Sequence, residues 1–239
     1  MTDRIPRLDK LLHQFTHGED ARRQTVTSAP LDPRLALLRR WQSARLAQTY
    51  SDLLAKPSFA PACRFFLSDI YAPRDFSQRD HDAERVHAFL SRLMPPATIQ
   101  ILTELIELNR LTTSLDRSLA DVLVERLGMA DSLTEEMYGR GYRLCNNFAE
   151  RAQQIALFEK LLNQVGEIAQ LRATGIVLAV ASKPVRTAGW ADLYDFVATG
   201  YAAFKPMRDY RQFSSTVARR ERQILARLFD GTPDPFAVP

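Results

Sequence analysis

Apolar residues recur at helical spacing along most of the chain, and this periodicity limits the fold more than any other feature. The longest such stretch ends near Gly128 and consists of Ile99, Leu102, Leu105, Ile106, Leu111, Leu115, Leu119 and Val122. Only nine glycines occur, and the one Asp-Gly dipeptide, Asp230-Gly231, follows a helical pattern. We therefore predict an all-α protein, a single compact multi-helix bundle of about seven to nine helices.

Local signals predict where several helices begin and end. Asp32-Pro33 is typical of a helix start, because proline at the first helical position loses no hydrogen bond. Ser132-Leu133-Thr134-Glu135 has the pattern of a capping box, which predicts Ser132 as the cap of the next helix. Gly231 is well placed as a C-terminal cap. Gly166, in contrast, lies inside a long amphipathic pattern, where we expect it to be a tolerated weakness.

The apolar run from Gly175 to Ala181 is ambiguous, because its composition and length also suit a buried strand. No other segment has the pattern of a partner strand, and a lone strand is not stable. We therefore predict a short buried helix here.

Three regions follow from these patterns. Residues 1–30 form a loosely ordered basic lead-in, residues 31–230 form the all-helical domain, and residues 231–239, with three prolines, form an extended tail. We find no internal repeat and no linker that would require a second domain.

Composition narrows the class of protein further. The chain is 46% hydrophobic and 25% charged, as in ordinary globular proteins, and no run of 18 apolar residues occurs. The first residues lack the apolar core of a signal peptide. The two cysteines, Cys63 and Cys145, are too few for a disulfide framework and suit a reducing compartment. A cytoplasmic protein with buried thiols is the expectation.

Sequence motifs for catalysis are mostly missing. The chain contains no glycine-rich phosphate loop, HExxH pair, CxxC or GxSxG. Glu84 and His87 have the spacing of two metal ligands on one helix, and Glu104 and Glu107 would supply a neighbouring face. Di-iron bundles need a second Glu-x-x-His pair, which is absent. We predict no cofactor and no metal, and keep a metal- or cofactor-dependent helical-bundle enzyme as an alternative.

The most unusual segment is residues 65–80, where four aromatic side chains lie close to three carboxylates and two arginines. Phe65, Phe66 and Tyr71 cannot all face one side of a helix, so other helices are expected to surround them. Asp69 then needs a partner. One reading is a structural corner closed by an ion pair and an aromatic plug. The other is an aromatic-lined ligand pocket, and its candidate ligand-binding residues are Phe65, Phe66, Asp69, Tyr71, Arg79 and Asp80.

The same segment, FFLSDIY at residues 65–71, resembles the motif of the bacterial FFLEELY-motif proteins. Phe65, Phe66, Leu67 and Tyr71 match that motif directly. Ser68 replaces its first Glu, Asp69 keeps the second acid, and Ile70 replaces Leu. The resemblance implies a bacterial protein, and the family has no established activity to carry over.

These observations favour a non-enzymatic protein that binds a protein partner or a small apolar ligand. A second alternative uses the basic C-terminal helix, because Lys205 to Phe229 contains seven cations and two acids. Its apolar stripe beside Arg219, Arg220, Arg222 and Arg227 would suit an anionic membrane or nucleic acid, or would close the core instead. The sequence leaves the oligomeric state open.

Overall fold

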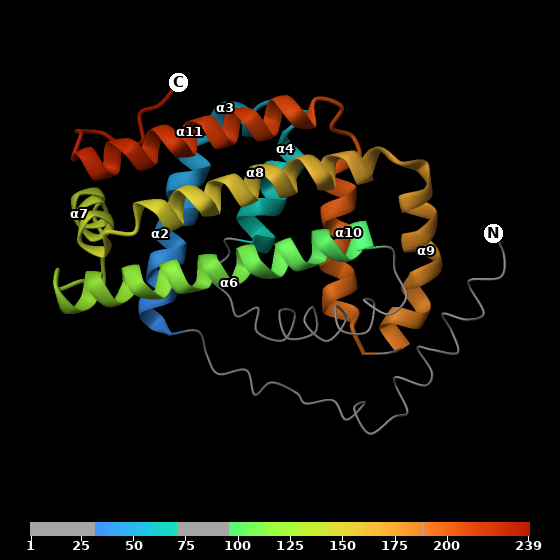
Figure 1. Ribbon diagram of the computed structural model, residues 1–239, viewed down its shortest axis with the longest axis horizontal. Helices are drawn as coiled ribbons and strands as arrows, with labels where there is room; N and C mark the ends of the chain where they lie inside the picture. Colours follow the sequence, from blue (N-terminus) through green and yellow to red (C-terminus); the bar gives the residue numbers. More distant parts are fainter. Residues whose placement is uncertain (1–31, 71–95, 188) are drawn as a thin grey trace.

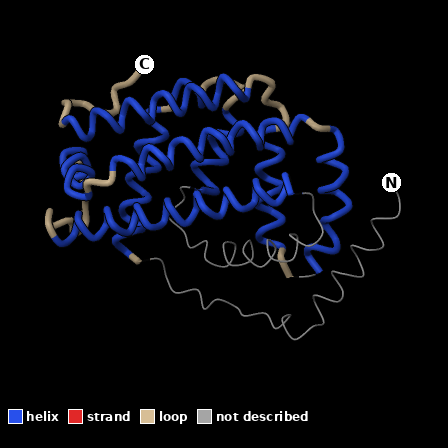
Figure 2. Tube along the Cα trace, viewed as in Figure 1, coloured by secondary structure: helices blue, strands red, loops and turns tan. Residues whose placement is uncertain are grey.

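A computed structural model describes residues 32–70, 96–187 and 189–239 (Figure 1). Within these ranges every regular element is a helix and no strand occurs, which confirms the predicted all-α fold (Figure 2). The α-helices comprise α2 (Pro33–Thr49), α3 (Ser51–Leu54), α4 (Ala60–Phe65), α6 (Pro96–Glu125), α7 (Glu135–Cys145), α8 (Phe148–Gln170), α9 (Arg172–Thr187), α10 (Ala191–Phe204) and α11 (Tyr210–Asp230). A π-helical segment, η3 (Phe66–Ile70), continues α4.

Three long helices, α6, α8 and α11, run side by side along the length of the molecule, with α8 packed against both of the others (Figure 1). Helices α2, α4 and α10 cross them at steep angles. Helix α7 packs at one end of the bundle against α6 and α11, and α9 packs at the other end against α8 and α10. The space enclosed between the crossing helices and the long ones holds the site described below.

Polar caps and glycines fix the ends of the helices. Asp32 is the N-cap of α2, as predicted, and its carboxylate accepts a hydrogen bond from the Arg34 amide at 2.9 Å. The cap of α7 is Thr134, whose hydroxyl accepts from the Met137 amide at 3.2 Å. The prediction of Ser132 was therefore wrong by two residues, since the threonine offers the same hydroxyl nearer the helix. Gly231 ends α11 with φ of 69°, as predicted.

Two clusters of buried apolar side chains form the core. One contains Phe59, Phe65, Phe204, Met207 and Phe213 among others, and joins α3, α4, α8, α10 and α11. The other joins α2, α6, α7 and α11, and its largest fully buried side chains are Leu38, Leu119, Leu123, Tyr138, Ile224 and Leu228. Helix α11 contributes to both clusters, so its apolar stripe is part of the core.

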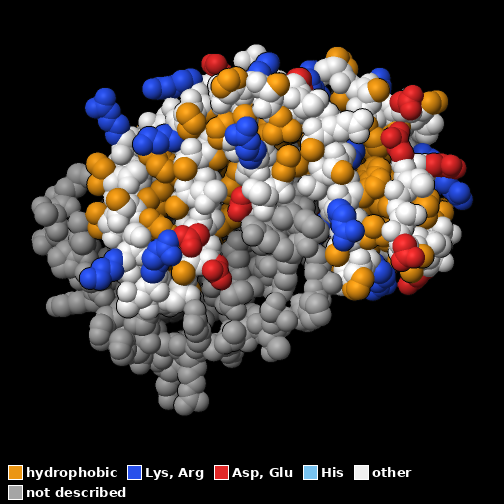
Figure 3. Space-filling view, turned by 180° about the vertical axis from the view of Figure 1, so that it is seen from behind, with side chains coloured by type: hydrophobic (Ala, Val, Ile, Leu, Met, Phe, Trp, Pro, Cys, Tyr) orange, Lys and Arg blue, Asp and Glu red, His pale blue; other side chains and the backbone are white. Residues whose placement is uncertain are grey.

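Helix α9 corrects one prediction and confirms another. The segment 175–181 is helical, as predicted, yet it is not buried. The side chains of Ile176 and Val177 are 67% and 61% exposed. The helix lies at the end of the bundle, where its described neighbours α8 and α10 cover only part of its surface, so an apolar composition there does not imply a core position. Seen from behind, the described surface shows apolar side chains among the charged ones (Figure 3).

Gly166 has a different role from the predicted one. A Cβ atom at this position in α8 would lie 2.4 Å from the ring of Tyr210, at the start of α11. The absence of a side chain lets the ring lie directly on the α8 backbone. Gly166 is thus a requirement of helix packing, and the tyrosine contact was not visible in the sequence.

The C-terminal tail, expected to be extended, turns back over the second core cluster. The Phe236 ring lies 5.7 Å from the ring of Trp41 and 6.0 Å from that of Tyr138. The Pro239 oxygen accepts hydrogen bonds from Arg219 and Arg220. The tail therefore covers part of the bundle.

Candidate functional site

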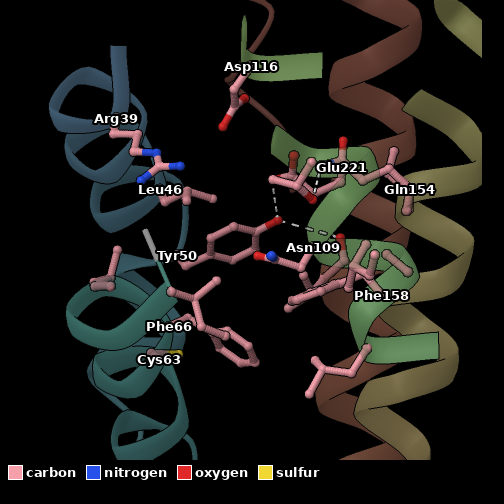
Figure 4. Close-up of a pocket in the computed structure, with 18 of the residues that line it drawn as sticks. Arg39, Leu46, Tyr50, Cys63, Phe66, Asn109, Asp116, Gln154, Phe158 and Glu221 are labelled. Carbon is pink, nitrogen blue, oxygen red and sulfur yellow. Dashed lines mark hydrogen bonds between the residues drawn. The ribbon is translucent and has the colours of Figure 1, made fainter. Parts of the chain in front are cut away.

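A cavity of about 220 Å³ lies among α2, α3, α4, η3, α6, α8, α10 and α11 (Figure 4). It borders the first core cluster, and side chains from all of these elements line it. Most of the described lining is apolar. One helix, α6, contributes a polar stripe to the same space. The cavity therefore has two chemically different parts, which we call its apolar end and its polar end.

Four phenylalanines form much of the apolar end: Phe66, Phe158, Phe196 and Phe213. The ring of Phe66 lies 5.2 Å from Phe158, in an edge-to-face arrangement, and 6.4 Å from Phe213. Leu46 and Cys63 complete the part of this wall contributed by α2 and α4. These contacts hold the rings around the space without filling it.

The polar end is built mainly by α6. Asn109, Thr112, Thr113 and Asp116 line the cavity, and their spacing of three, four and seven residues places them on one helix face. From α8, the Gln154 amide donates to the Thr112 hydroxyl at 2.8 Å. This ordered polar stripe faces a largely apolar chamber.

A second polar group lies at the junction of α2 and α11. The Tyr50 hydroxyl donates to Glu221 at 2.7 Å, as Figure 4 shows. The Arg45 guanidinium pairs with the same carboxylate oxygen of Glu221 at 2.7 Å. Burial opposes the charged form of Arg45, and the charge of Glu221 more than offsets this, so the pKa of Arg45 lies above its usual value. Glu221 is therefore already neutralised by the protein.

Asp116 is the most deeply buried acid of the site, with only 5% of its side chain exposed. Gln42 donates to one carboxylate oxygen at 3.1 Å, and the nearest Arg151 nitrogen lies 4.0 Å from it. Burial raises the pKa of Asp116. The charge of Arg151, the hydrogen bond from Gln42 and the charge of Arg39 lower the pKa, but together they do not cancel the effect of burial. Arg151 itself lies over the Tyr142 ring.

The aromatic segment contributes to the cavity in part. Phe66 lines it, whereas Phe65 points into the core, where its ring lies 5.3 Å from that of Phe196. Asp69 is half-buried outside the lining and accepts a hydrogen bond from the Ser68 hydroxyl at 2.6 Å. Tyr71, Arg79 and Asp80 lie outside the described residues, as do Arg74 and the lead-in 1–30. The resemblance to the FFLEELY-motif proteins stays a prediction.

The residues considered for a metal site are only partly described. Glu84 and His87 lie outside the described ranges. Glu104 accepts hydrogen bonds from Lys160 at 2.6 Å and from Gln100 at 2.9 Å. In the described part of the chain, no three His, Cys, Asp or Glu side chains gather as metal ligands would.

Both cysteines are free thiols. Cys63 is buried in α4 and forms part of the cavity wall. Burial raises its pKa to about 11, so the side chain is a neutral, small apolar group near neutral pH. Cys145 is half-buried, and burial raises its pKa as well.

Arginines of the basic C-terminal helix α11 form ion pairs and hydrogen bonds with other groups of the protein. Arg220 forms a bidentate ion pair with Asp52, at 2.8 and 2.9 Å, although it is only 8% exposed. Arg222 pairs with Glu159, and Arg227 donates to the Ala237 carbonyl. The apolar stripe of α11 is buried, so in this fold it is not available to a lipid surface. The predicted binding of an anionic membrane or nucleic acid would therefore have to use the arginines of α11 without its apolar stripe.

Sequence reasoning missed the polar stripe of α6 and Arg39. The stripe did leave a signal, because Asn109, Thr112, Thr113 and Asp116 recur at helical spacing beside the apolar positions of the same helix. A polar stripe flanked by apolar residues on a central helix indicates an internal polar surface. Arg39 left no such signal.

Among the described residues, no single helix is long and apolar enough to span a membrane. The pair α8 and α9, bent by 86°, meets the length and composition limits only when taken together. One family model, described as "Domain of unknown function (DUF8198)", matches residues 21–235. No curated protein and no solved structure matches the chain.

Proposed function

The chain belongs to the DUF8198 family of domains of unknown function, and we propose that it is a non-enzymatic binding protein that holds a small, mainly apolar molecule in the cavity among α2, α6, α8 and α11. The observation that carries this proposal is the cavity itself, with phenylalanines around one end and a polar stripe at the other. Ligand sites in proteins typically combine an apolar wall with a few polar groups that orient the ligand.

The size of the cavity limits the ligand. An apolar cavity of about 150 Å³ holds one benzene molecule, so by simple scaling a space of about 220 Å³ holds roughly nine non-hydrogen atoms. A medium-chain alcohol or a small aromatic compound has this size. The ligand is expected to place its apolar body against Phe66 and Phe158 and its polar group against α6.

The chemistry of the walls supports binding. Cys63 is held as a neutral thiol by burial, and Glu221 is held by Arg45 and Tyr50. These groups therefore shape the chamber and need no ligand to compensate them. Their arrangement before any ligand enters lowers the conformational cost of binding.

The experiment is a calorimetric titration of the full chain with 1-octanol, together with its effect on the melting temperature. We expect saturable binding, and a melting temperature that rises with octanol concentration. Two variants, Leu46→Trp and Cys63→Leu, add atoms inside the cavity and should weaken binding at least tenfold. Leu144→Trp is the matched control, because Leu144 is 38% exposed and outside the cavity.

The proposal fails if 1-octanol does not bind the unaltered chain. It also fails if both cavity variants, shown by circular dichroism to be folded, bind octanol as tightly as the control does.

A further inference from the structure

The geometry of the polar end points to a primary amine as the head group of the ligand, and we propose that this head, as an ammonium, pairs with Asp116. The inference rests on the proposed function and names the chemical class of the ligand: a compact alkyl- or arylamine. Figure 4 places Asp116 at one end of the cavity, with Phe66 and Phe158 toward the other end.

The carboxylate of Asp116 has acceptor capacity left over. An ionised carboxylate offers about four lone-pair positions. One hydrogen bond, from Gln42 at 3.1 Å, reaches an oxygen of Asp116, and Arg151 at 4.0 Å is beyond hydrogen-bond distance from that oxygen. The side chain is 95% removed from solvent and lines the cavity.

The other acid of the lining is better compensated. Among the described residues, the charged side chains that line the cavity are Arg39, Asp116 and Glu221. Glu221 is paired with Arg45, and Arg39 already has an interaction within the protein. The positive charges of Arg151 and Arg39 act on Asp116 without cancelling the cost of its burial, so a further positive charge on a ligand would still stabilise the ionised carboxylate.

The neighbouring positions of the stripe suit the remaining N–H groups of an ammonium. A primary ammonium carries three N–H donors and no acceptor. Thr113 lies one helical turn before Asp116 on the same face and lines the cavity, and a threonine hydroxyl accepts hydrogen bonds. An amine head at Asp116 also places its carbon chain toward the phenylalanines, because the cavity continues in that direction.

The energetics of Asp116 agree with this assignment. Its pKa is raised mainly by burial, which means that the ionised form destabilises the folded protein relative to an exposed carboxylate. An ammonium delivered by the ligand would lower this pKa again. A buried acid with a perturbed pKa in a cavity is a frequent property of ligand sites.

The test compares three ligands with the same eight-carbon chain: 1-octylamine, 1-octanol and octanoate. Calorimetric titration of the unaltered chain at pH 7 should give octylamine at least tenfold tighter binding than octanoate, with octanol between them. Asp116→Asn should weaken octylamine binding at least tenfold and change octanol binding less than threefold. Glu107→Gln, an exposed acid on the same helix outside the cavity, should leave all three affinities unchanged.

Each result decides a separate point. Octanoate binding more tightly than octylamine would overturn the amine assignment and make Arg39 the partner of the head group. Equal losses of octylamine affinity in Asp116→Asn and Glu107→Gln would overturn it as well, because the effect would then be one of general charge. If none of the three ligands binds, the proposed function itself fails. The ligand ranking uses the unaltered chain, so it remains decisive even if Asp116→Asn does not fold.

Discussion

Replacing Phe66 with alanine tests whether this ring holds the apolar end of the cavity together. The ring is half-buried and lies within 6.4 Å of three other phenylalanine rings, those of Phe158, Phe204 and Phe213. It also contacts Phe65, its neighbour in sequence, at 5.8 Å. Its position at the junction of α4 and η3 therefore connects the first core cluster to the cavity.

The size of the effect follows from this environment. Truncating a fully buried phenylalanine to alanine costs about 3–5 kcal/mol. One side of the Phe66 ring already faces the cavity, so fewer packing contacts are lost than in a filled core. We therefore expect the free energy of unfolding to fall by about 3 kcal/mol. For a chain of this length each kcal/mol lowers the melting temperature by about 2–4 °C, which gives a decrease of roughly 6–12 °C.

The assay is thermal unfolding followed by circular dichroism at 222 nm, with urea unfolding to obtain the free energy. Ile176→Ala is the matched control, because Ile176 is 67% exposed and such surface changes stay within about 0.5 kcal/mol. A melting temperature of Phe66→Ala within 2 °C of the unaltered chain would refute the packing argument. The ring would then have to be free of the contacts described here.

Three further changes test other parts of the structure. Burial raises the pKa of the Cys63 thiol to about 11, so at pH 8 it should react with a maleimide about 100-fold more slowly in the folded protein than in the urea-unfolded chain. Equal rates in the two states would show that the thiol is exposed. The hydrogen bonds from Arg220 lower the pKa of Asp52 in the folded state, so this pair stabilises the fold above the ordinary pKa of 3.8 and loses that contribution as the pH falls. Asp52→Asn should therefore show a smaller loss of stability between pH 6 and pH 2, and an unchanged acid profile would contradict the ion pair. Gly166→Ala should lower the free energy of unfolding by about 1 kcal/mol, measured by urea unfolding. The clash of the new methyl group with the Tyr210 ring costs about 1–3 kcal/mol, which exceeds the gain from the higher helix propensity of alanine. Gly139→Ala, where a Cβ would meet only ordinary contacts at 3.6 Å, should be neutral or stabilising; a gain in both variants would refute the close packing.

The sequence carried most of the information on the fold, because helix formation depends on local spacing. The apolar period of the stretch 99–122 predicted α6, and Asp32-Pro33 predicted the start of α2. Predictions of burial were less successful. The segment 175–181 has the composition of a core element, and α9 is exposed because of where the bundle places it. Exposure depends on the neighbours that the whole fold supplies, and no local pattern contains them.

The site was predictable only in part, for a similar reason. Phe66 was singled out from its aromatic neighbourhood, and it lines the cavity. Asp116 was not singled out, although the polar stripe of α6 to which it belongs has helical spacing. A polar residue on a long helix is usually exposed, so the spacing alone did not indicate an internal site. The significance of Asp116 comes from Gln42 and Arg151, which are 74 and 35 residues away in sequence, and only the fold brings them close to it.

Xenon binding to crystals of the full chain tests the central claim most directly, because xenon enters apolar cavities that exist before any ligand binds. We predict one strong anomalous peak at the apolar end of the cavity, beside the rings of Phe66 and Phe158, and its loss in crystals grown with 1-octanol. A cavity occupied by ordered water, or closed by side chains with no xenon peak, would contradict the account of a preformed apolar binding site.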